Sequence, residues 1–458
     1  MGGILKSTWE MLHDGRFLKK ALMIACPVAL QGMLNTIVNM VDTLMIGGLG
    51  STAIAAVGLA NKVFFVFSLL VFGIVSGGGI LAAQFWGSGD VKNIRKVLGL
   101  CVMLAMVGAM FFVVPALTAP RMVMRIFTTS EGSIELGAKY LRIAALSYPF
   151  IALTNVYVAM LRATNKVVFP VICSCIAIVV NICLNYVLIF GKFGAPTMGV
   201  AGAACATLTA RCIEVTLVLF YVYGKKLPLA CGPKGMFGWH KAFITQFLET
   251  SAPVIANEFM WGLGTTMYSL AYGRMSDDAV AAITIATTIQ DIAVVLFQGL
   301  SAATAVILGN ELGAGKLKRA EKYATQFFIL QFIVTITAGV CLILGRWKII
   351  GIYSITPEVA MDVSRCLLVF VAYMPAKMFN YVNIVGVLRS VVIPGCACSW
   401  IPAVYGALEF RCVFRRISMA SAIYGVYALV MSEEVYKLIL GYIRYRQKKW
   451  LKNLAIQV

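Results

Sequence analysis

Three carboxylates lie within long apolar stretches of this sequence, where a charged group needs a chemical reason to be present. Asp42 lies late in the first stretch, Glu258 lies inside the seventh and Asp291 lies in the eighth. An ionised carboxylate at the centre of a bilayer costs about 2.5–3.5 kcal/mol on insertion scales. We therefore expect Asp42 and Glu258 to face the protein interior, and all three groups to bind and release a proton or a cation as their access to water changes. A cap or an interfacial position for Asp42, and structural hydrogen bonding for Glu258 and Asp291, are the alternatives.

Amides in the same apolar stretches could complete such a cation site. Asn181 and Asn185 are four residues apart, so they share one face of a helix. Their carbonyl oxygens can bind a cation and their N–H groups can bind a substrate, although hydrogen bonding between helices is an equal alternative. Thr207 can add an oxygen, but a threonine in a membrane helix often bonds its own backbone. Gln290 and Asn257, each next to a carboxylate, are possible substrate or coupling residues.

Other kinds of chemistry have little support. Arg211 and Glu214 are three residues apart, which favours a structural ion pair near the membrane edge. The sequence holds only 2 His, so a membrane-embedded enzyme with clustered His, Asp or Cys is not expected. Gly313-Ala314-Gly315-Lys316 lacks the spacing and the preceding strand of a nucleotide-binding P-loop. We expect no cofactor other than a coupling ion, Na⁺ or H⁺.

The elements that carry these residues are membrane-spanning helices. The chain is 60% hydrophobic and 13% charged, whereas a soluble domain carries nearer about a quarter charged residues. A span needs about 20 apolar residues, and roughly twelve such stretches occur. They centre near residues 34, 67, 106, 149, 178, 211, 258, 293, 333, 373, 401 and 428. The short alternating segments of a membrane barrel are absent from the sequence. The composition therefore predicts an all-α polytopic membrane protein.

The two halves of the chain repeat one pattern. Pro27 matches Pro253 at an offset of 226 residues by subtraction, and Gly87 matches Gly313 at the same offset. Leu161-Arg162-Ala163 matches Leu388-Arg389-Ser390 at an offset of 227. The repeat predicts two six-helix lobes, residues 1–225 and 244–443, joined by a cytoplasmic linker, 226–243, and followed by a basic tail, 444–458. A duplicated helical bundle in a membrane is typical of a transporter.

The net charge of +20 is a signal of topology. Basic residues gather in alternate connections and in the tail: Lys19-Lys20, Lys92, Arg95, Lys96, Arg162, Lys166, Lys225-Lys226, Lys316, Lys318, Arg319 and residues 444–452. The positive-inside rule predicts that both termini and these connections are cytoplasmic, in a multi-pass protein of the cell membrane. An even number of spans per half makes the repeats parallel. The charged start leads into a full-length span, so no cleavable signal is expected, and nucleic acid is not an expected partner.

Seven short motifs occur in a specific order along the duplicated chain: Pro27-Val28, Val41-Asp42-Thr43, Gly87-Ser88-Gly89, Leu161-Arg162-Ala163, Gly199 to Ala204, Asn257-Glu258 and Leu312 to Lys316. In this order and spacing they resemble the multidrug and toxic compound extrusion (MATE) transporters. The resemblance covers nearly all of the chain except about residues 391–422. It implies two six-helix lobes around a cavity and cation-coupled export of lipophilic, often cationic, small molecules by alternating access.

The resemblance also implies roles for individual residues. In the family an acidic residue of the first span joins polar residues of the fifth and sixth in a cation site, which carries over to Asp42, Asn181, Asn185 and Thr207. A carboxylate of the seventh span carries over to Glu258. Some members have a carboxylate where this chain has Asn185, and some have another in the tenth span, so the choice between Na⁺ and H⁺ stays open. A flippase for lipid-linked saccharides is an alternative, but it should line its cavity with several Arg or Lys.

Residues 391–422 break the repeat pattern. They carry Glu409, Arg411, Arg415 and Arg416 where an apolar eleventh span is expected, and such charges are unfavourable in a bilayer. Back-translation with one nucleotide restored after Ser390 gives Ser-Gly-Gly-Asp-Thr and then an apolar stretch, before the family-like sequence resumes near Ile423. We therefore expect a shifted reading frame, either real or an artefact of sequencing. A chain made as written would then be a weakly active or non-transporting remnant, and resequencing of the gene decides the matter.

Overall fold

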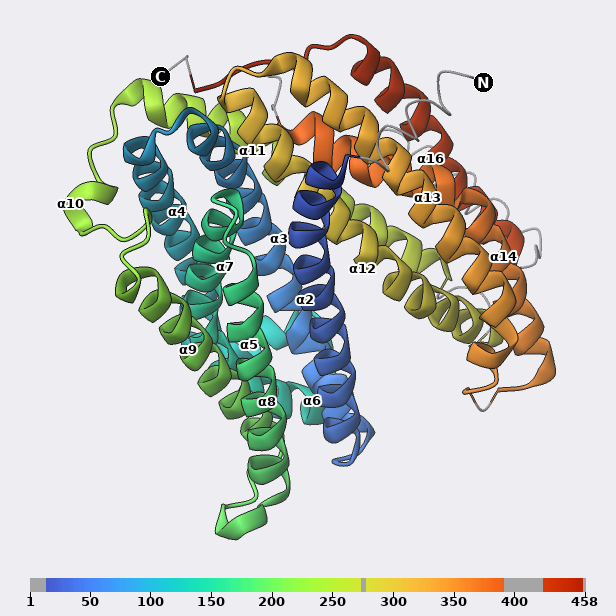
Figure 1. Ribbon diagram of the computed structural model, residues 1–458. Helices are drawn as coiled ribbons and strands as arrows, with labels where there is room; N and C mark the ends of the chain where they lie inside the picture. Colours follow the sequence, from blue (N-terminus) through green and yellow to red (C-terminus); the bar gives the residue numbers. More distant parts are fainter. Residues whose placement is uncertain (1–13, 273–276, 354, 391–422, 456–458) are drawn as a thin grey trace. The chain divides into compact units, whose positions relative to one another are not determined.

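The computed structural model in Figure 1 describes residues 14–272, 277–353, 355–390 and 423–455. Every regular element in these ranges is a helix, which confirms the all-α class. The chain forms two compact units: unit 1 comprises Met1–Ala29 and Ala256–Gln457, and unit 2 comprises Leu30–Ile255. The predicted lobes 1–225 and 244–443, with their linker, divide the chain at other points and stay a prediction. Residues 391–422, where we expect a shifted frame, lie outside the described ranges.

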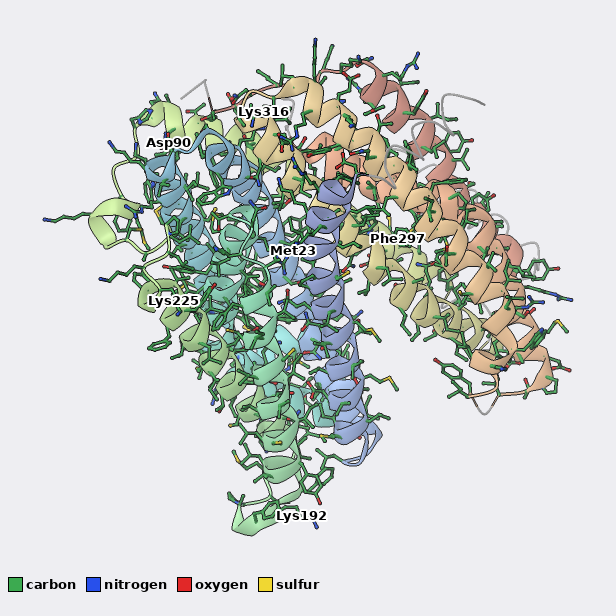
Figure 2. The ribbon with its side chains drawn as sticks, in the orientation of Figure 1. Met23, Asp90, Lys192, Lys225, Phe297 and Lys316 are labelled. Atoms are coloured by element: carbon green, nitrogen blue, oxygen red, sulfur yellow. The ribbon has the colours of Figure 1, made fainter. Side chains whose placement is uncertain are left out.

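Unit 2 consists mainly of helices from the first half of the sequence. Its elements are α3 (Ser51–Ser88), α4 (Val91–Thr118), α5 (Pro120–Arg125), α6 (Glu131–Ala144), η1 (Ala145–Ser147), α7 (Tyr148–Ala163), α8 (Val168–Phe190), η2 (Lys192–Gly194), α9 (Val200–Gly224) and α10 (Pro233–Met236). Figure 2 shows Asp90, which precedes α4, and Lys192, which follows α8, at opposite ends of this unit. These ends are the expected cytoplasmic and outer sides of the membrane.

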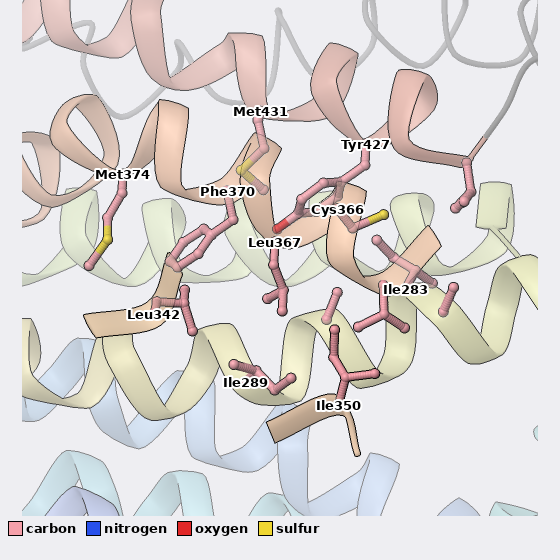
Figure 3. Packing of buried hydrophobic residues seen from close by; sticks show 14 of the residues in the cluster. Ile283, Ile289, Leu342, Ile350, Cys366, Leu367, Phe370, Met374, Tyr427 and Met431 are labelled. Atoms are coloured by element: carbon pink, nitrogen blue, oxygen red, sulfur yellow. The ribbon is translucent and has the colours of Figure 1, made fainter. Parts of the chain in front are cut away.

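Unit 1 consists mainly of helices from the second half. Its elements are α12 (Asp277–Gly313), α13 (Leu317–Ile350), α14 (Pro357–Asn380), the π-helical η3 (Tyr381–Val387), η4 (Leu388–Ser390) and α16 (Ile423–Arg446). Figure 3 shows its apolar core, in which Phe370 and Leu367 of α14 pack with Ile283 of α12 and Tyr427 of α16. Phe370 is completely buried, so this core fixes the positions of three spans.

The predicted spans coincide with helices throughout the described residues. Nine helical stretches there are long and apolar enough to cross a membrane. Helix α11 (Lys241–Tyr272) and α16 have similar lengths but carry more polar residues, among them Glu258 on α11. Together with the nine apolar stretches, α11 and α16 account for eleven of the twelve expected spans among the described residues. The twelfth, centred near residue 401, falls outside the described ranges.

The first helix of each half begins in one unit and ends in the other. Helix α2 (Gly15–Gly47) begins in unit 1, and α11 begins in unit 2. A Cβ added at Gly73 of α3 would lie 2.7 Å from Cα of Ile255 on α11. A Cβ added at Gly299 of α12 would lie 2.9 Å from Cβ of Ala29 on α2. Gly73 corresponds to Gly299 in the repeat, and Ala29 corresponds to Ile255, each at the offset of 226 residues. The same close helix crossing therefore occurs in both units. Small residues allow such backbone contact between membrane helices.

Candidate functional site

The candidate cation site is built on the hairpin of α8 and α9 in unit 2. The two helices approach closely because Gly202, in the Gly199–Ala204 motif, has no side chain: a Cβ there would lie 2.6 Å from the carbonyl oxygen of Leu188. Gly191 ends α8 with φ 66, a left-handed conformation that favours glycine. This hairpin sets one face of α9 against the amide-bearing face of α8.

The structure brings the four predicted residues of unit 2 together. Asn185 Nδ2 donates to Asp42 Oδ1 at 2.6 Å and also to Asn181 Oδ1 at 3.2 Å. Asn181 Nδ2 lies 3.5 Å from Thr207 Oγ1, which donates to the carbonyl of Ala203 on its own helix at 3.0 Å. Thr207 therefore bonds its backbone, as threonines in membrane helices often do, and faces the amides as well. The expected proximity of Asp42, Asn181 and Asn185 is confirmed.

One acceptor in this cluster lacks a partner. Asn185 is 1% exposed, and its Oδ1 has no hydrogen-bond partner among the described residues. A buried carbonyl oxygen without a partner is unfavourable by about 1–3 kcal/mol, so it favours a donor or a cation at this point. Together with the carboxylate of Asp42 and Oδ1 of Asn181, it offers oxygen ligands of the kind that Na⁺ or a proton carrier such as hydronium requires.

Asp42, Asn181 and Thr207 of this cluster line a cavity of about 490 Å³ within unit 2. Its walls are mostly apolar, with Phe64 and Phe65 of α3 and Tyr148 of α7 among them. Besides Tyr148, ten polar or ionisable residues line it: Asn39, Asp42, Thr43, Asn61, Ser68, Tyr140, Ser147, Asn181, Thr207 and Arg211. A cavity of this size and composition can hold a small amphipathic molecule beside the cation site.

Arg211 lines the cavity of unit 2. It forms the expected pair with Glu214, with Arg211 Nη1 at 2.6 Å from Glu214 Oε2, but its side chain lines the cavity that holds Asp42. The i, i+3 spacing showed that the two side chains share a face. It did not show which helices that face opposes, because the packing of α8 and α9 decides this.

A chain of hydrogen bonds ties Glu214 to three other helices of unit 2. Ser174 Oγ donates to Glu214 Oε1 at 2.7 Å, and Gln31 Nε2 donates to Ser174 Oγ at 2.9 Å. Arg162 Nη2 donates to Gln31 Oε1 at 2.5 Å. The chain joins α2, α7, α8 and α9, and both oxygens of Glu214 are occupied within it. Residue types and spacing gave no signal for this network.

Glu258 lies in unit 1, where it is 8% exposed. Arg389 Nη2 donates to Glu258 Oε1 at 2.5 Å, while Asn257 Nδ2 lies 3.5 Å from the same oxygen. The same separation of 131 residues joins Arg389 to Glu258 and Arg162 to Gln31. The repeated Leu-Arg motif therefore places an arginine against the first helix of each half. Glu258 faces the interior as expected, in an ion pair, and its role in coupling stays a prediction.

Gln290 and Asp291 lie in unit 1. Gln290 is buried on α12, where its Oε1 accepts from the hydroxyl of Tyr427 at 2.5 Å. Asp291 is exposed and has no hydrogen-bond partner among the described residues. The structure thus gives Gln290 a hydrogen bond to α16, and substrate or coupling roles for both residues stay predictions.

Two acidic residues of α16 were missed by the sequence analysis. Glu433 accepts from Tyr268 at 2.7 Å, and Glu434 accepts from Asn380 Nδ2 at 3.0 Å through Oε2. Lys377 lies 3.7 Å from Glu434. The signal was the pair of adjacent glutamates in the last apolar stretch, which the weaker hydropathy of that stretch obscured. These groups form ion pairs and hydrogen bonds within unit 1, apart from Asp42.

Comparison with known proteins decides the family. The MatE family model matches residues 27–187 and 253–394, which is more than half of the chain and covers both repeats. The chain belongs to the MatE family. This MatE member is a multi-pass membrane transporter, and its resemblance to MATE transporters is confirmed.

Two bacterial relatives of this MatE member are described as probable multidrug resistance protein NorM. The protein of Thermotoga maritima is 27% identical over 349 residues, which cover 76% of this chain and 74% of the relative. The protein of Neisseria meningitidis serogroup B is 24% identical over 404 residues, which cover 86% and 85%. Both alignments extend over most of each protein.

Solved structures share the fold of this MatE member. A MOP superfamily transporter from Pyrococcus furiosus has a TM-score of 0.84 at 17% identity, over 94% of this chain and 96% of that chain. A multidrug resistance MATE family transporter in an outward-facing conformation has a TM-score of 0.83 at 18% identity, over 95% and 96%. The expected class of polytopic helical bundle with about twelve spans is therefore confirmed.

Proposed function

We propose that this MatE member is a cation-coupled antiporter that exports lipophilic small molecules, including drugs and toxins, by alternating access. The observation that carries the proposal is the hydrogen-bonded cluster of Asp42, Asn181 and Asn185, in which Asp42 and Asn181 line an apolar-walled cavity. The names of the bacterial relatives, probable multidrug resistance proteins, agree with it. Na⁺ or H⁺ is the coupling ion.

The chemistry of the cluster explains how an ion and a substrate can compete. Asp42 uses Oδ1 to accept from Asn185, so the other carboxylate oxygen remains for an ion or a cargo amine. Binding of a cation neutralises Asp42 and weakens its attraction for a positive substrate, and loss of the cation restores that attraction. Such exchange at one carboxylate couples two opposite movements when it is linked to a change of access.

The alternative flippase has less support from the cavity. A site for the phosphates of a lipid-linked saccharide should present several arginine or lysine side chains. Among the described residues, Arg211 is the one basic residue that lines the cavity of unit 2. A single guanidinium beside a carboxylate suits a small molecule better than a diphosphate.

Purified protein in proteoliposomes tests the proposed function. Ethidium movement is followed by fluorescence after a Na⁺ gradient or a pH gradient is imposed, each alone. We expect one gradient to drive accumulation in wild type and Asp42→Asn to abolish it. Asp278→Asn, a change at an exposed carboxylate at the start of α12, is the matched control and should transport like wild type. Accumulation without either gradient, or undiminished accumulation by Asp42→Asn, would contradict the proposal.

A further inference from the structure

We propose that unit 1 binds the headgroups of anionic phospholipids at one end of its helical bundle. This is the end at which α2 begins, α12 is followed by α13, and the tail follows α16. It is also the expected cytoplasmic end. The inference concerns a surface of unit 1 and does not depend on the proposed exchange of ion and cargo.

The start of α2 is held against α12 and α13 at this end. Phe17 is buried, and the centroid of its ring lies 5.3 Å from that of Tyr323 on α13. Lys20 Nζ lies 3.7 Å from Glu311 Oε1 near the end of α12. Basic residues from segments that are far apart in the sequence therefore share one surface.

The tail after α16 is packed on the same end of unit 1. Trp450 is 1% exposed, and Asn453 Nδ2 donates to the backbone carbonyl of Gly313 at 3.1 Å. The buried indole and this hydrogen bond fix the tail over the last residue of α12. Lys449 and Lys452, next to these two anchors in the sequence, are exposed. The tail thus adds two lysines to the surface.

The acidic residues at this end are already paired. Asp14 Oδ2 lies 3.8 Å from Lys322 Nζ, and Glu321 Oε1 lies 2.6 Å from Lys448 Nζ, while Glu311 has the contact described above. Six other basic residues of these segments are exposed and have neither an acidic nor a hydrogen-bond partner among the described residues. We call them the basic surface: Arg16, Lys19, Lys316, Lys318, Lys449 and Lys452.

The excess positive charge is confined to this end of unit 1. At the opposite end, the described side chains in the last turn of α13 and the first turns of α12 and α14 are balanced, with three basic and three acidic residues: Arg346, Lys348, Arg365, Asp278, Glu358 and Asp362. Six like charges without counter-charges repel one another, so an anionic partner stabilises the basic surface.

Exposed apolar side chains beside the charges identify a lipid as that partner. Leu317, which is 39% exposed, lies between Lys316 and Lys318 at the start of α13. Tyr442, in the last turns of α16, is 48% exposed, and the guanidinium of Arg446 lies 5.9 Å from its ring centroid. A nucleic acid or an acidic peptide would leave these side chains in water. An anionic membrane surface offers acyl chains to them and phosphates to the basic residues.

Native mass spectrometry of the full chain in detergent tests the inference. Dioleoyl phosphatidylglycerol, which is anionic, or dioleoyl phosphatidylcholine, which is zwitterionic, is added at one fixed salt concentration, because salt screens surface charge. The first binding step then gives a dissociation constant for each lipid. We expect wild type to prefer phosphatidylglycerol, and Lys449→Gln/Lys452→Gln to weaken phosphatidylglycerol binding by about tenfold. Phosphatidylcholine binding should stay unchanged.

The variants change charge without removing a contact of the described residues. Lys449→Arg/Lys452→Arg keeps both charges and should bind phosphatidylglycerol as wild type does. The matched control is Lys192→Gln/Lys348→Gln, which removes two exposed lysines outside the basic surface. A second measurement is the unfolding temperature, which phosphatidylglycerol should raise in wild type and the control more than in Lys449→Gln/Lys452→Gln, because ligand binding stabilises the folded state.

Each outcome supports or overturns the inference. A preference for phosphatidylglycerol that falls in the glutamine variant and persists in the arginine variant and the control supports it. Equal binding of the two lipids by wild type, as expected if the basic residues serve only to orient the chain during insertion, would overturn it. So would an equal loss in the glutamine variant and the control. Binding of oligothymidylate that depends on Lys449 and Lys452, without any lipid preference, would assign the surface to nucleic acid and refute the inference.

Discussion

The amide groups of α8 form the hydrogen-bonded surroundings of Asp42. Asn185 contributes both a donor to Asp42 at 2.6 Å and a carbonyl oxygen without a partner. A cation that uses this oxygen stabilises the folded protein, by about 2.7 kcal/mol at a concentration one hundred times its dissociation constant. We therefore expect Asn185 to link ion binding to thermal stability.

Substitution of Asn185 tests this link. We expect Asn185→Ala to remove most of the rise in unfolding temperature that Na⁺ or low pH gives to wild type in detergent. Asn185→Asp restores an oxygen ligand and should keep a cation-dependent rise. An Asn185→Ala protein whose unfolding temperature responds to ions as wild type does would show that the carbonyl is not a ligand.

The ion pair of Glu258 and Arg389 is the second prediction at this scale. Removal of one partner from a buried pair costs about 3–5 kcal/mol, because the other charge stays buried without compensation. We expect Glu258→Gln to lower the unfolding temperature strongly and Glu258→Gln/Arg389→Gln to recover much of the loss. If the double variant is stable but transports nothing, Glu258 acts in coupling. If it transports normally, the pair has a structural role only.

Single residues also show what the sequence could reveal about the site. Spacing placed Asn181 and Asn185 on one face, and burial cost selected Asp42 and Glu258, all without a structure. Arg211 was assigned correctly to Glu214 but not to the cavity. A spacing rule gives neighbours on one helix, whereas contacts such as Gln31 with Ser174 or Arg389 with Glu258 depend on packing between distant helices.

The helices themselves were easier to predict than their partners. Long apolar stretches must satisfy their backbone hydrogen bonds internally, so they form helices whatever their neighbours are. No pattern in the residues indicated that α2 and α11 each begin in one unit and end in the other. It also gave no indication of the π-helical turn at Tyr381–Val387, since local backbone geometry of this kind follows from tertiary contacts.

The repeated helix crossing gives a prediction for the elements. An added Cβ at Gly299 would lie 2.9 Å from Cβ of Ala29 and closer still to the backbone oxygen of Ala25. Backbone atoms cannot shift without distortion of the helix that holds them. We therefore expect Gly299→Ala to separate α12 from α2 and to reduce the folded yield and unfolding temperature. Gly79→Ala is the control, since nothing lies within 4 Å of a Cβ there. Equal stability of the two variants would refute the crossing.

The distribution of basic residues gives a prediction for the whole molecule. The connections after α3, α7, α9 and α12 carry the lysine and arginine clusters, so we expect them and the C-terminal tail to be cytoplasmic. Fusions of alkaline phosphatase, which is active only outside, and of green fluorescent protein report the side of each junction. Phosphatase fused after Gly194 should be active, and phosphatase fused after Lys226 should be inactive. The reverse pattern would overturn the assigned orientation.

The central claim, the proposed exchange of ion and cargo, concerns the whole molecule. Its most direct test is cation release triggered by cargo. Proteoliposomes are loaded with radioactive Na⁺ and a pH-sensitive dye, and ethidium is then added outside without any imposed gradient. We expect entry of ethidium to drive out one of the two cations from vesicles with wild-type protein, and Asp42→Asn to show no such release. Entry of ethidium through wild-type protein with neither Na⁺ nor H⁺ leaving, or equal release from Asp42→Asn, would contradict the account.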